Sequence, residues 1–78
     1  MVKAYAMVIT AAGRSTHLVE DIRAIDGVID AHVIAGEFDI MVEVDAPSIQ
    51  AVREVIVDRI QRLEGIGTTR TYLALDED

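Results

Sequence analysis

The order of apolar runs and glycines constrains the fold of this chain more than any other feature. Two stretches follow the same plan: a short apolar run, a segment with helical spacing, a glycine, and a second apolar run. The glycine stands in Gly27-Val28 in the first stretch and in Gly65-Ile66 in the second. Glycine often follows a helix end, because it adopts the left-handed conformation without strain. The sequence therefore predicts a duplicated strand–helix–strand unit, in the order βαββαβ.

The bounds of six elements follow from the spacing of apolar residues and from capping signals. A first helix is expected to begin at Ser15 or Thr16, either of which can cap it. A second helix is expected to begin after Asp45-Ala46-Pro47, with Asp45 as the cap and the proline in the first turn. The expected strands cover Lys3–Ala11, Val28–Ala35, Phe38–Val44 and Ile66–Leu75.

Each expected helix carries one apolar face, which is typical of a helix packed on a sheet. The face of the first helix is formed by Leu18, Ile22 and Ile25. The face of the second helix is a longer stripe, formed by Ile49, Val52, Ile56, Ile60 and Leu63. Gly27 and Gly65 are expected to end the two helices.

The fold class follows from this order of elements. Right-handed crossovers place both helices on one face of a four-stranded antiparallel sheet, with spatial strand order 4-1-3-2. This is a ferredoxin-like α+β fold. A chain of 78 residues allows a single domain. We expect that domain to cover residues 1–75, and residues 76–78 to form a solvated acidic tail.

The face of the sheet away from the helices is expected to be apolar. In the third strand, one side carries Asp39, Met41 and Glu43, and the other carries Phe38, Ile40, Val42 and Val44. In the first strand both sides are apolar, with Tyr5, Met7 and Ile9 opposite Ala4, Ala6 and Val8. A sheet face exposed to water is normally polar. The sequence therefore predicts that two copies pack through their open sheet faces and form a homodimer.

Composition excludes several functional classes. There is no cysteine, which excludes disulfides and thiol chemistry. The net charge of −7 disfavours direct binding to nucleic acid, because an acidic chain repels phosphates. No signal peptide and no membrane-spanning stretch is present in the sequence, so we expect a soluble, cytoplasmic protein with no membrane partner. The acidic, lysine-poor composition is compatible with a high-salt cytoplasm.

The segment Gly36-Glu37-Phe38-Asp39 is the first candidate for a binding site. It separates two expected strands and resembles a two-residue type II′ turn, which requires glycine at its first position. Asp39 then stands in a strand, where a carboxylate has no obvious packing role. Exposed backbone beside a carboxylate can receive a small zwitterion. The alternative is an ordinary tight turn followed by a solvated aspartate.

The sequence resembles the ligand-binding domain of Lrp/AsnC regulators over nearly its whole length. The stretch from Gly27 to Val44 is similar to the family's central hairpin, with Gly-Val at the second strand and Gly-acidic-aromatic-Asp before the third. The stretch Gly65–Thr71 is similar to the family's Gly-Val-x-x-Thr-x-Thr strand. Two departures stand out. The chain begins at the first strand with no helix-turn-helix segment, and Val33 replaces a residue that is often polar or basic.

The resemblance implies a homodimer formed by sheet faces, rings of dimers, and small effectors, usually amino acids, bound at dimer–dimer contacts. By matching position, Gly36, Glu37, Phe38 and Asp39 form one wall of that site. Thr69 and Thr71 form another part, in the same or in a neighbouring subunit, although strand propensity alone also explains these threonines. The chain is then an effector-binding module in transcription control that assembles, and full-length relatives are candidate partners.

Two other functions share this topology. One is a small dimeric enzyme of the monooxygenase or isomerase type, but the chain has no Trp and no Asn, and His17 and His32 are separated. We therefore expect no enzyme activity, no catalytic residue, no metal site and no cofactor. The other is an ACT-like amino-acid sensor domain. In that case the ligand would lie at the first strand–helix junction instead of the hairpin turn.

Overall fold

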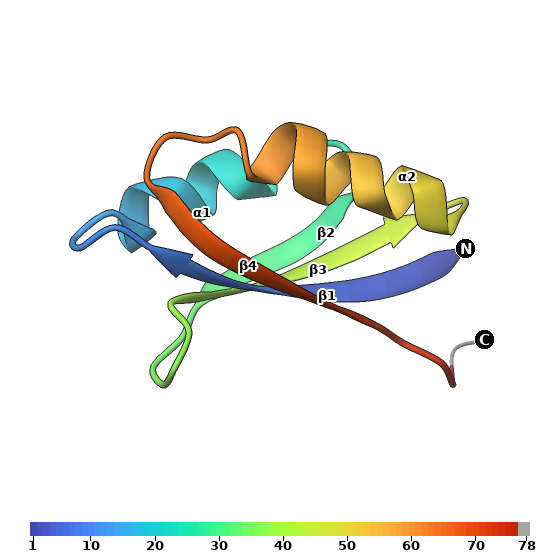
Figure 1. Cartoon of the computed structure of the whole chain (residues 1–78), viewed down its shortest axis with the longest axis horizontal. Coiled ribbons are helices and arrows are strands. Elements are labelled where there is room, and N and C mark those ends of the chain that lie inside the picture. The colour runs from blue at the N-terminus through green and yellow to red at the C-terminus, as the bar shows by residue number, and fades with distance from the viewer. Residues whose placement is uncertain (77–78) are drawn as a thin grey trace.

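A four-stranded antiparallel sheet carries the helices on one of its faces (Figure 1). The structure, a computed structural model, describes residues 1–76. The strands are β1 (Val2–Thr10), β2 (Val28–Val33), β3 (Ile40–Ala46) and β4 (Ile66–Leu73). The helices are α1 (Ser15–Arg23) and α2 (Ile49–Arg53), and the π-helix η1 (Glu54–Ile60) continues α2. The predicted order βαββαβ is confirmed.

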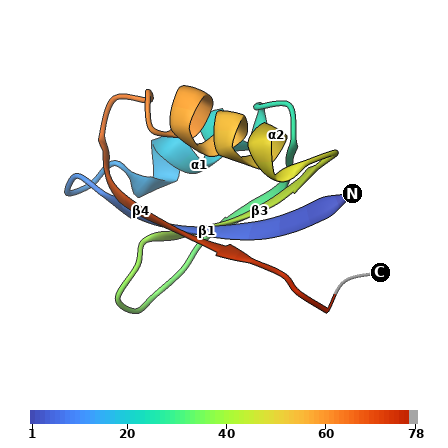
Figure 2. The same cartoon turned by 45° about the vertical axis from the view of Figure 1, so that its right-hand side comes forward.

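The strands lie in the order β2-β3-β1-β4, which confirms the predicted neighbours and places β1 and β3 at the centre. All three pairs are antiparallel. Figure 2 shows the twist of the sheet, with both helices above it and the β2–β3 loop below. We call the side of the sheet away from the helices the open face. The ferredoxin-like α+β fold class is thus confirmed.

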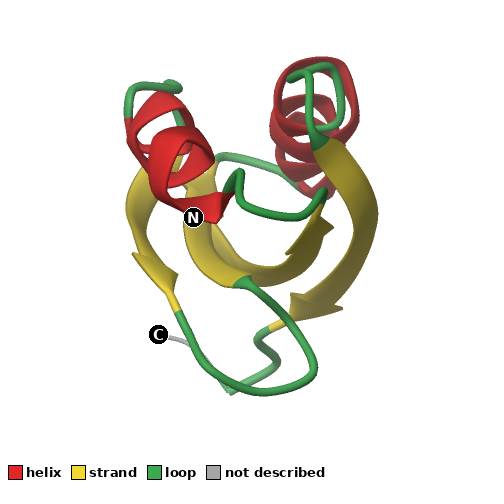
Figure 3. Cartoon of the chain, turned by 90° about the vertical axis from the view of Figure 1, so that its left-hand side faces the viewer, coloured by secondary structure: helices red, strands yellow, loops and turns green. Residues whose placement is uncertain are grey.

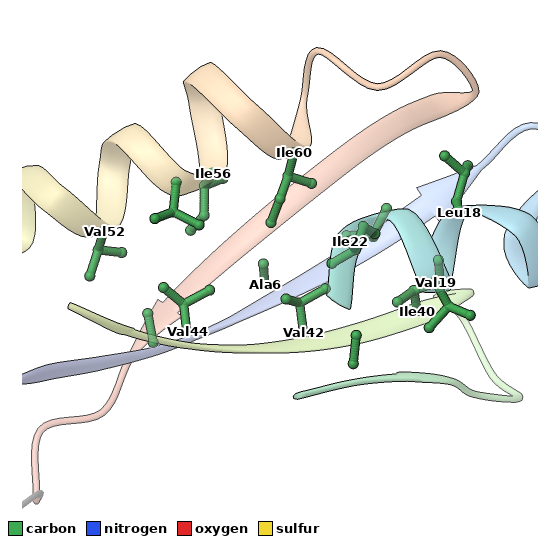
Figure 4. Packing of buried hydrophobic residues seen from close by; sticks show 14 of the residues in the cluster. Ala6, Leu18, Val19, Ile22, Ile40, Val42, Val44, Val52, Ile56 and Ile60 are labelled. Atoms are coloured by element: carbon green, nitrogen blue, oxygen red, sulfur yellow. The ribbon is translucent and has the colours of Figure 1, made fainter. Parts of the chain in front are cut away.

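The core lies between the helices and one side of the sheet (Figure 4). The central strands contribute two kinds of side chain: small Ala4 and Ala6 from β1, and branched Val42 and Val44 from β3. The small residues leave room for larger side chains from above, and Ile60 lies over Ala6 in Figure 4. Burying one such aliphatic side chain stabilises the fold by about 1.5–3 kcal/mol. The helices contribute seven residues to the core: Leu18, Val19, Ile22, Val52, Val55, Ile56 and Ile60.

The predicted helix starts are wrong in detail. Arg14 occupies the N-cap of α1 and makes no capping bond, while Ser15 already belongs to the helix. The N-cap of α2 is Ser48, whose hydroxyl accepts the Ala51 N–H at 3.1 Å. Asp45 remains in β3 instead of capping. Proline restricts the residue before it to extended conformations, so Pro47 keeps Ala46 extended at the end of β3. Ser48 is also extended, with φ of −150° and ψ of 166°, and the helix begins after it.

The apolar stripe of the second helix also differs from the prediction. Ile49 is 61% exposed, whereas Val55 joins the core. The π-helix η1 shifts the apolar face, because its hydrogen bonds span five residues instead of four. An example is the Gln61 N–H, which donates to Ile56 O at 2.9 Å. Val55 packs on Gly27, where a Cβ atom would come within 2.7 Å of Val55 Cγ2.

Both helices end earlier than predicted. The C-cap of α1 is Ala24 and that of η1 is Gln61, so each helix ends before its expected glycine. Ile25 lies beyond α1 and packs on the core from the following turn. Gly27 and Gly65 have φ of 97° and 101°, and each comes immediately before a strand. These glycines therefore direct the chain into β2 and β4 and do not cap the helices.

Candidate functional site

The β2–β3 connection is longer than the predicted two-residue turn. Strand β2 ends at Val33 and β3 begins at Ile40, which leaves a six-residue loop, residues 34–39. Ile34 N–H donates to Asp39 O at 2.8 Å and closes the loop at its base. Gly36 lies inside the loop with φ of 151°, a conformation that favours glycine. The type II′ turn is therefore wrong, but a glycine is still required here.

The loop projects from the open face. Figures 1 and 3 show it curling away from the sheet on the side opposite the helices. Glu37 is exposed, and Phe38 is only partly buried, although its spacing had suggested that it belongs with Ile40 in the core. Because Phe38 precedes the first residue of β3, the strand alternation does not extend to it.

Asp39 holds this loop to the end of β1. Its carboxylate Oδ2 accepts the Thr10 N–H at 2.8 Å and lies 3.4 Å from the Thr10 hydroxyl, which donates to it. Its own N–H donates to Val8 O at 2.8 Å. The β1–β3 register ends at Val8 and Ile40, so these bonds continue the pairing beyond the last strand residues. The carboxylate that had no obvious packing role is thus an anchor between two segments.

Thr69 and Thr71 lie on the helix side of the sheet. Their direct partners on β1 are Val8 and Ala6, both buried beneath the helices, and opposite residues in an antiparallel pair share a face. Gln61 Nε2 donates to Thr69 Oγ1. Within one subunit, the structure therefore does not bring these threonines together with the loop, which lies on the other side of the sheet.

A pocket of about 430 Å³ opens between the loop and β4 on the open face. The loop contributes Glu37 and Phe38, β1 contributes Ile9, and β4 contributes Arg70 and Tyr72. Arg70 and Tyr72 were not predicted as site residues. Strand alternation indicates their position, because the residues next to Thr69 and Thr71 in β4 face the opposite side of the sheet, which is the open face from which the loop projects.

The rest of the open face is apolar at its centre and charged beside it. Tyr5, Met7 and Met41 are half-buried there. Beside them Lys3 Nζ lies 3.1 Å from Glu43 Oε2. The Glu43 carboxylate, through this hydrogen bond and its charge, raises the pKa of Lys3 above its usual value. This half-buried apolar centre agrees with the expectation that a second copy covers the open face.

The other candidate features offer fewer groups that could bind a ligand. A groove of about 270 Å³ between the second helix and β4 is lined mainly by apolar side chains, with Arg53 and Thr71 at its polar positions. His32 Nε2 lies 3.1 Å from Asp30 Oδ2, and both side chains are about half exposed. Across residues 1–76, no cluster of His, Cys, Asp and Glu is suited to hold a metal ion. No helix in the same range is long and apolar enough to cross a membrane.

Comparison with known proteins gives a consistent result. The family model of the Lrp/AsnC ligand binding domain matches residues 3–77. An HTH-type transcriptional regulator of Pyrococcus abyssi is 35% identical over 57 residues, which are 73% of this chain and 38% of that protein. The leucine-responsive regulatory protein of Escherichia coli is 27% identical over 56 residues, which are 72% of this chain and 34% of that protein. The chain thus spans little more than a third of the length of these curated relatives.

Solved structures agree with the family match. The crystal structure of FFRP-DM1 superposes with a TM-score of 0.90 at 31% identity, covering 96% of this chain and 100% of that one. Protein PHS023 from Pyrococcus horikoshii gives 0.90 at 31% identity, covering 99% and 93%. AsnC of Escherichia coli gives 0.89 at 25% identity, and the match covers 97% of this chain but 52% of AsnC. These superpositions show that the chain shares its fold with these proteins.

Proposed function

The chain belongs to the Lrp/AsnC ligand-binding domain family, and on this premise we propose that it binds a small-molecule effector, an amino acid, and acts by assembling. The family match over residues 3–77 is the observation that carries the proposal. The relatives are transcriptional regulators, so the assembled module serves transcription control in the cytoplasm rather than catalysis.

Two observations support an amino acid as the effector. One relative is a leucine-responsive regulatory protein. The candidate residues also suit a zwitterion: backbone N–H groups and threonine hydroxyls can donate to a carboxylate, and acidic side chains can accept from an ammonium group.

The separation of the candidate residues supports a site between subunits. The Gly36–Asp39 segment projects from the open face, whereas Thr69 and Thr71 lie on the helix side of β4. A site that uses both sets needs the loop of one copy and the edge strand of another. A ligand held by two subunits stabilises the assembly that contains its site, by mass action. This is how effector binding can change the regulatory state.

Assembly also provides a route to the output. An acidic surface repels DNA, and we assign no DNA contact to these residues. We propose instead that copies of the chain pair with each other through the open face and, by the same contacts, with full-length Lrp/AsnC relatives. Mixed assembly is compatible with the fold, because this chain and the matching part of AsnC share it.

Isothermal titration calorimetry with each of the standard L-amino acids tests the proposal. We expect saturable heat with at least one of them, and a change in mass by light scattering when it is added. Thr69→Val and Thr71→Val are expected to weaken binding, with Thr16→Val, an exposed threonine on α1, as the matched control. Absence of heat with every amino acid at millimolar concentration would contradict the proposal.

A further inference from the structure

The groove between the second helix and β4 is an apolar surface that stays open in the single subunit. Its volume is about 270 Å³, below the roughly 300–1,000 Å³ of most small-molecule sites, so it suits one large side chain better than a whole ligand. Three of its aliphatic residues remain exposed: Ile49, Val57 and Leu73. Exposed apolar side chains gathered in one place mark a surface that another protein segment covers.

The groove lies on the helix side of the sheet. Thr71 and Leu73 stand opposite Ala6 and Ala4 on β1, which are buried beneath the helices. A copy packed on the open face covers the other side of the sheet and leaves the groove free. A segment of another copy that fills the groove therefore comes from a different dimer.

Arg53 gives the groove one positive charge. It belongs to neither of the ion pairs found in residues 1–76. The residues three or four positions away on the helix, where an ion pair could form, carry no charge: Ile49, Gln50, Ile56 and Val57. The groove thus presents a guanidinium among aliphatic side chains, which favours an occupant with an apolar group next to a carboxylate.

The β2–β3 loop carries this combination of groups. It projects from the open face (Figure 3), and its exposed Glu37 is followed directly by the partly buried Phe38. Glu37, like Arg53, takes part in neither ion pair of the described residues. Asp39 fastens the loop to Thr10 through the 2.8 Å hydrogen bond described above. A loop that is already held in place loses less conformational entropy when it docks.

We propose that the β2–β3 loop of one copy docks in the groove of a copy from another dimer. Phe38 packs among the aliphatic side chains of the groove and supplies most of the binding energy, as buried aromatic anchors do in other interfaces. Glu37 pairs with Arg53, whose planar guanidinium matches a carboxylate in a bidentate arrangement. The charge pair fixes the register of the contact more than its strength.

The C-terminal end of β4 is the rival occupant within a second copy. Leu75 and Asp76 also place an apolar side chain beside a carboxylate, and Leu75 is 93% exposed. We favour the loop because it is closed at its base by the bond from Ile34 N–H to Asp39 O and anchored to β1 as well. The test below separates the two segments.

This inference rests on the proposed function and names the contact that it requires. Thr71 lines the groove, so a docked loop brings Gly36–Asp39 of one copy beside Thr71 of another. An effector held between them stabilises the contact by mass action. The loop and the groove are different surfaces of each copy, so the contact is heterologous and can continue from dimer to dimer.

Charge reversal on the full chain tests the contact. Glu37→Arg and Arg53→Glu each bring like charges together, so each alone should weaken assembly beyond the dimer by about tenfold or more. An equimolar mixture of the two variants should regain the larger species, because every loop then meets a groove of opposite charge. Sedimentation velocity measures this without added ligand and with millimolar L-leucine.

Matched variants locate the contact. Glu64→Arg and Arg62→Glu reverse exposed charges outside the groove and should assemble like the unaltered chain. Phe38→Ala should weaken the larger species by about tenfold, because it removes the aromatic anchor. Asp76→Arg should have no effect. If Arg53→Glu is rescued by mixing with Asp76→Arg and not with Glu37→Arg, the C-terminal segment fills the groove and the proposal is overturned. Circular dichroism melting shows whether each variant remains folded.

The contact and the proposed function fail in distinguishable ways. The contact is overturned if both charge reversals assemble like the unaltered chain, or if the unaltered chain forms nothing larger than a dimer with or without L-leucine. Calorimetry on the same samples measures effector binding separately. Saturable heat with an amino acid would then leave effector binding in place and remove the contact alone. Rescue by mixing, with no heat from any amino acid, would establish the contact and overturn the effector.

Discussion

The Asp39 carboxylate accepts a hydrogen bond from the Thr10 N–H at 2.8 Å and thereby fastens the β2–β3 loop to the end of β1. The same residue receives Ile34 N–H on its carbonyl and donates its N–H to Val8 O, each at 2.8 Å. One residue therefore connects the loop base, the loop end and the central strand. The geometry of the candidate site depends on this anchor.

Asp39→Ala is expected to destabilise the chain by about 1–3 kcal/mol, because the Thr10 N–H loses a charged acceptor in a partly buried place. Asp39→Asn keeps an acceptor oxygen and should lose less. Urea denaturation measures both, with Asp58→Ala, an exposed aspartate on η1, as the control. Equal stability of Asp39→Ala and the unaltered chain would show that the loop does not need this bond.

Gly27→Ala should be more damaging than Gly13→Ala. Both glycines have positive φ, 97° and 76°, so alanine is strained at either position by roughly 1–2 kcal/mol. Only at Gly27 does the new Cβ also meet Val55 Cγ2, at 2.7 Å. Thermal melting of both variants tests the difference. The double variant Gly27→Ala with Val55→Ala should show coupling, because the second change removes the atom that clashes.

The pKa of Lys3 should fall when Glu43 is neutralised. The Glu43 carboxylate raises the pKa of Lys3 in the folded chain, so Glu43→Gln should lower this pKa. Asp45 raises it by a smaller amount, so Asp45→Asn should change the pKa of Lys3 less. Since this is the one lysine of the chain, its side-chain NMR signal can be followed without ambiguity. A folded pKa above the unfolded value means that the pair stabilises the fold below the unfolded pKa. That contribution is lost as the pH rises through the folded pKa, above 10.5.

Met7→Lys should weaken or abolish the dimer. Met7 is at the centre of the open face, between Met41 on β3 and Arg70 on β4, so a second copy would bring two added charges together. Ile49→Lys, on the helix side, is the control and should leave the dimer intact. Sedimentation velocity separates the two results. A Met7→Lys chain that sediments as the unaltered one would contradict dimerisation through this face.

Sequence periodicity was sufficient for the topology, because alternating and helical spacings determine which faces must be buried. Ala4, Ala6 and Val8 in the core, with Tyr5 and Met7 on the open face, follow directly from alternation. Local boundaries were less predictable. The start of α2 depends on how Pro47 restricts its neighbour, and the register of η1 depends on packing against Gly27, which no local pattern contains.

The candidate site shows the same division. The sequence could single out the Gly36–Asp39 segment as a candidate, since it places glycine and a carboxylate between two strands. The anchor from Asp39 to Thr10, 29 residues away in the sequence, could not be predicted, and neither could the pocket that the loop shares with Arg70, because each joins segments that are distant along the chain. Spacing along the chain does not report such contacts.

The most direct measurement is an NMR titration of the ¹⁵N-labelled chain with L-leucine, L-methionine and L-phenylalanine. We expect saturable shifts for the amides of Glu37, Phe38 and Arg70 with at least one of these ligands, while the amides of the exposed His17 and Arg62 remain unchanged. Spectra in which no amide of the loop or of β4 responds to any amino acid would contradict the claim that this chain is an amino-acid-binding module.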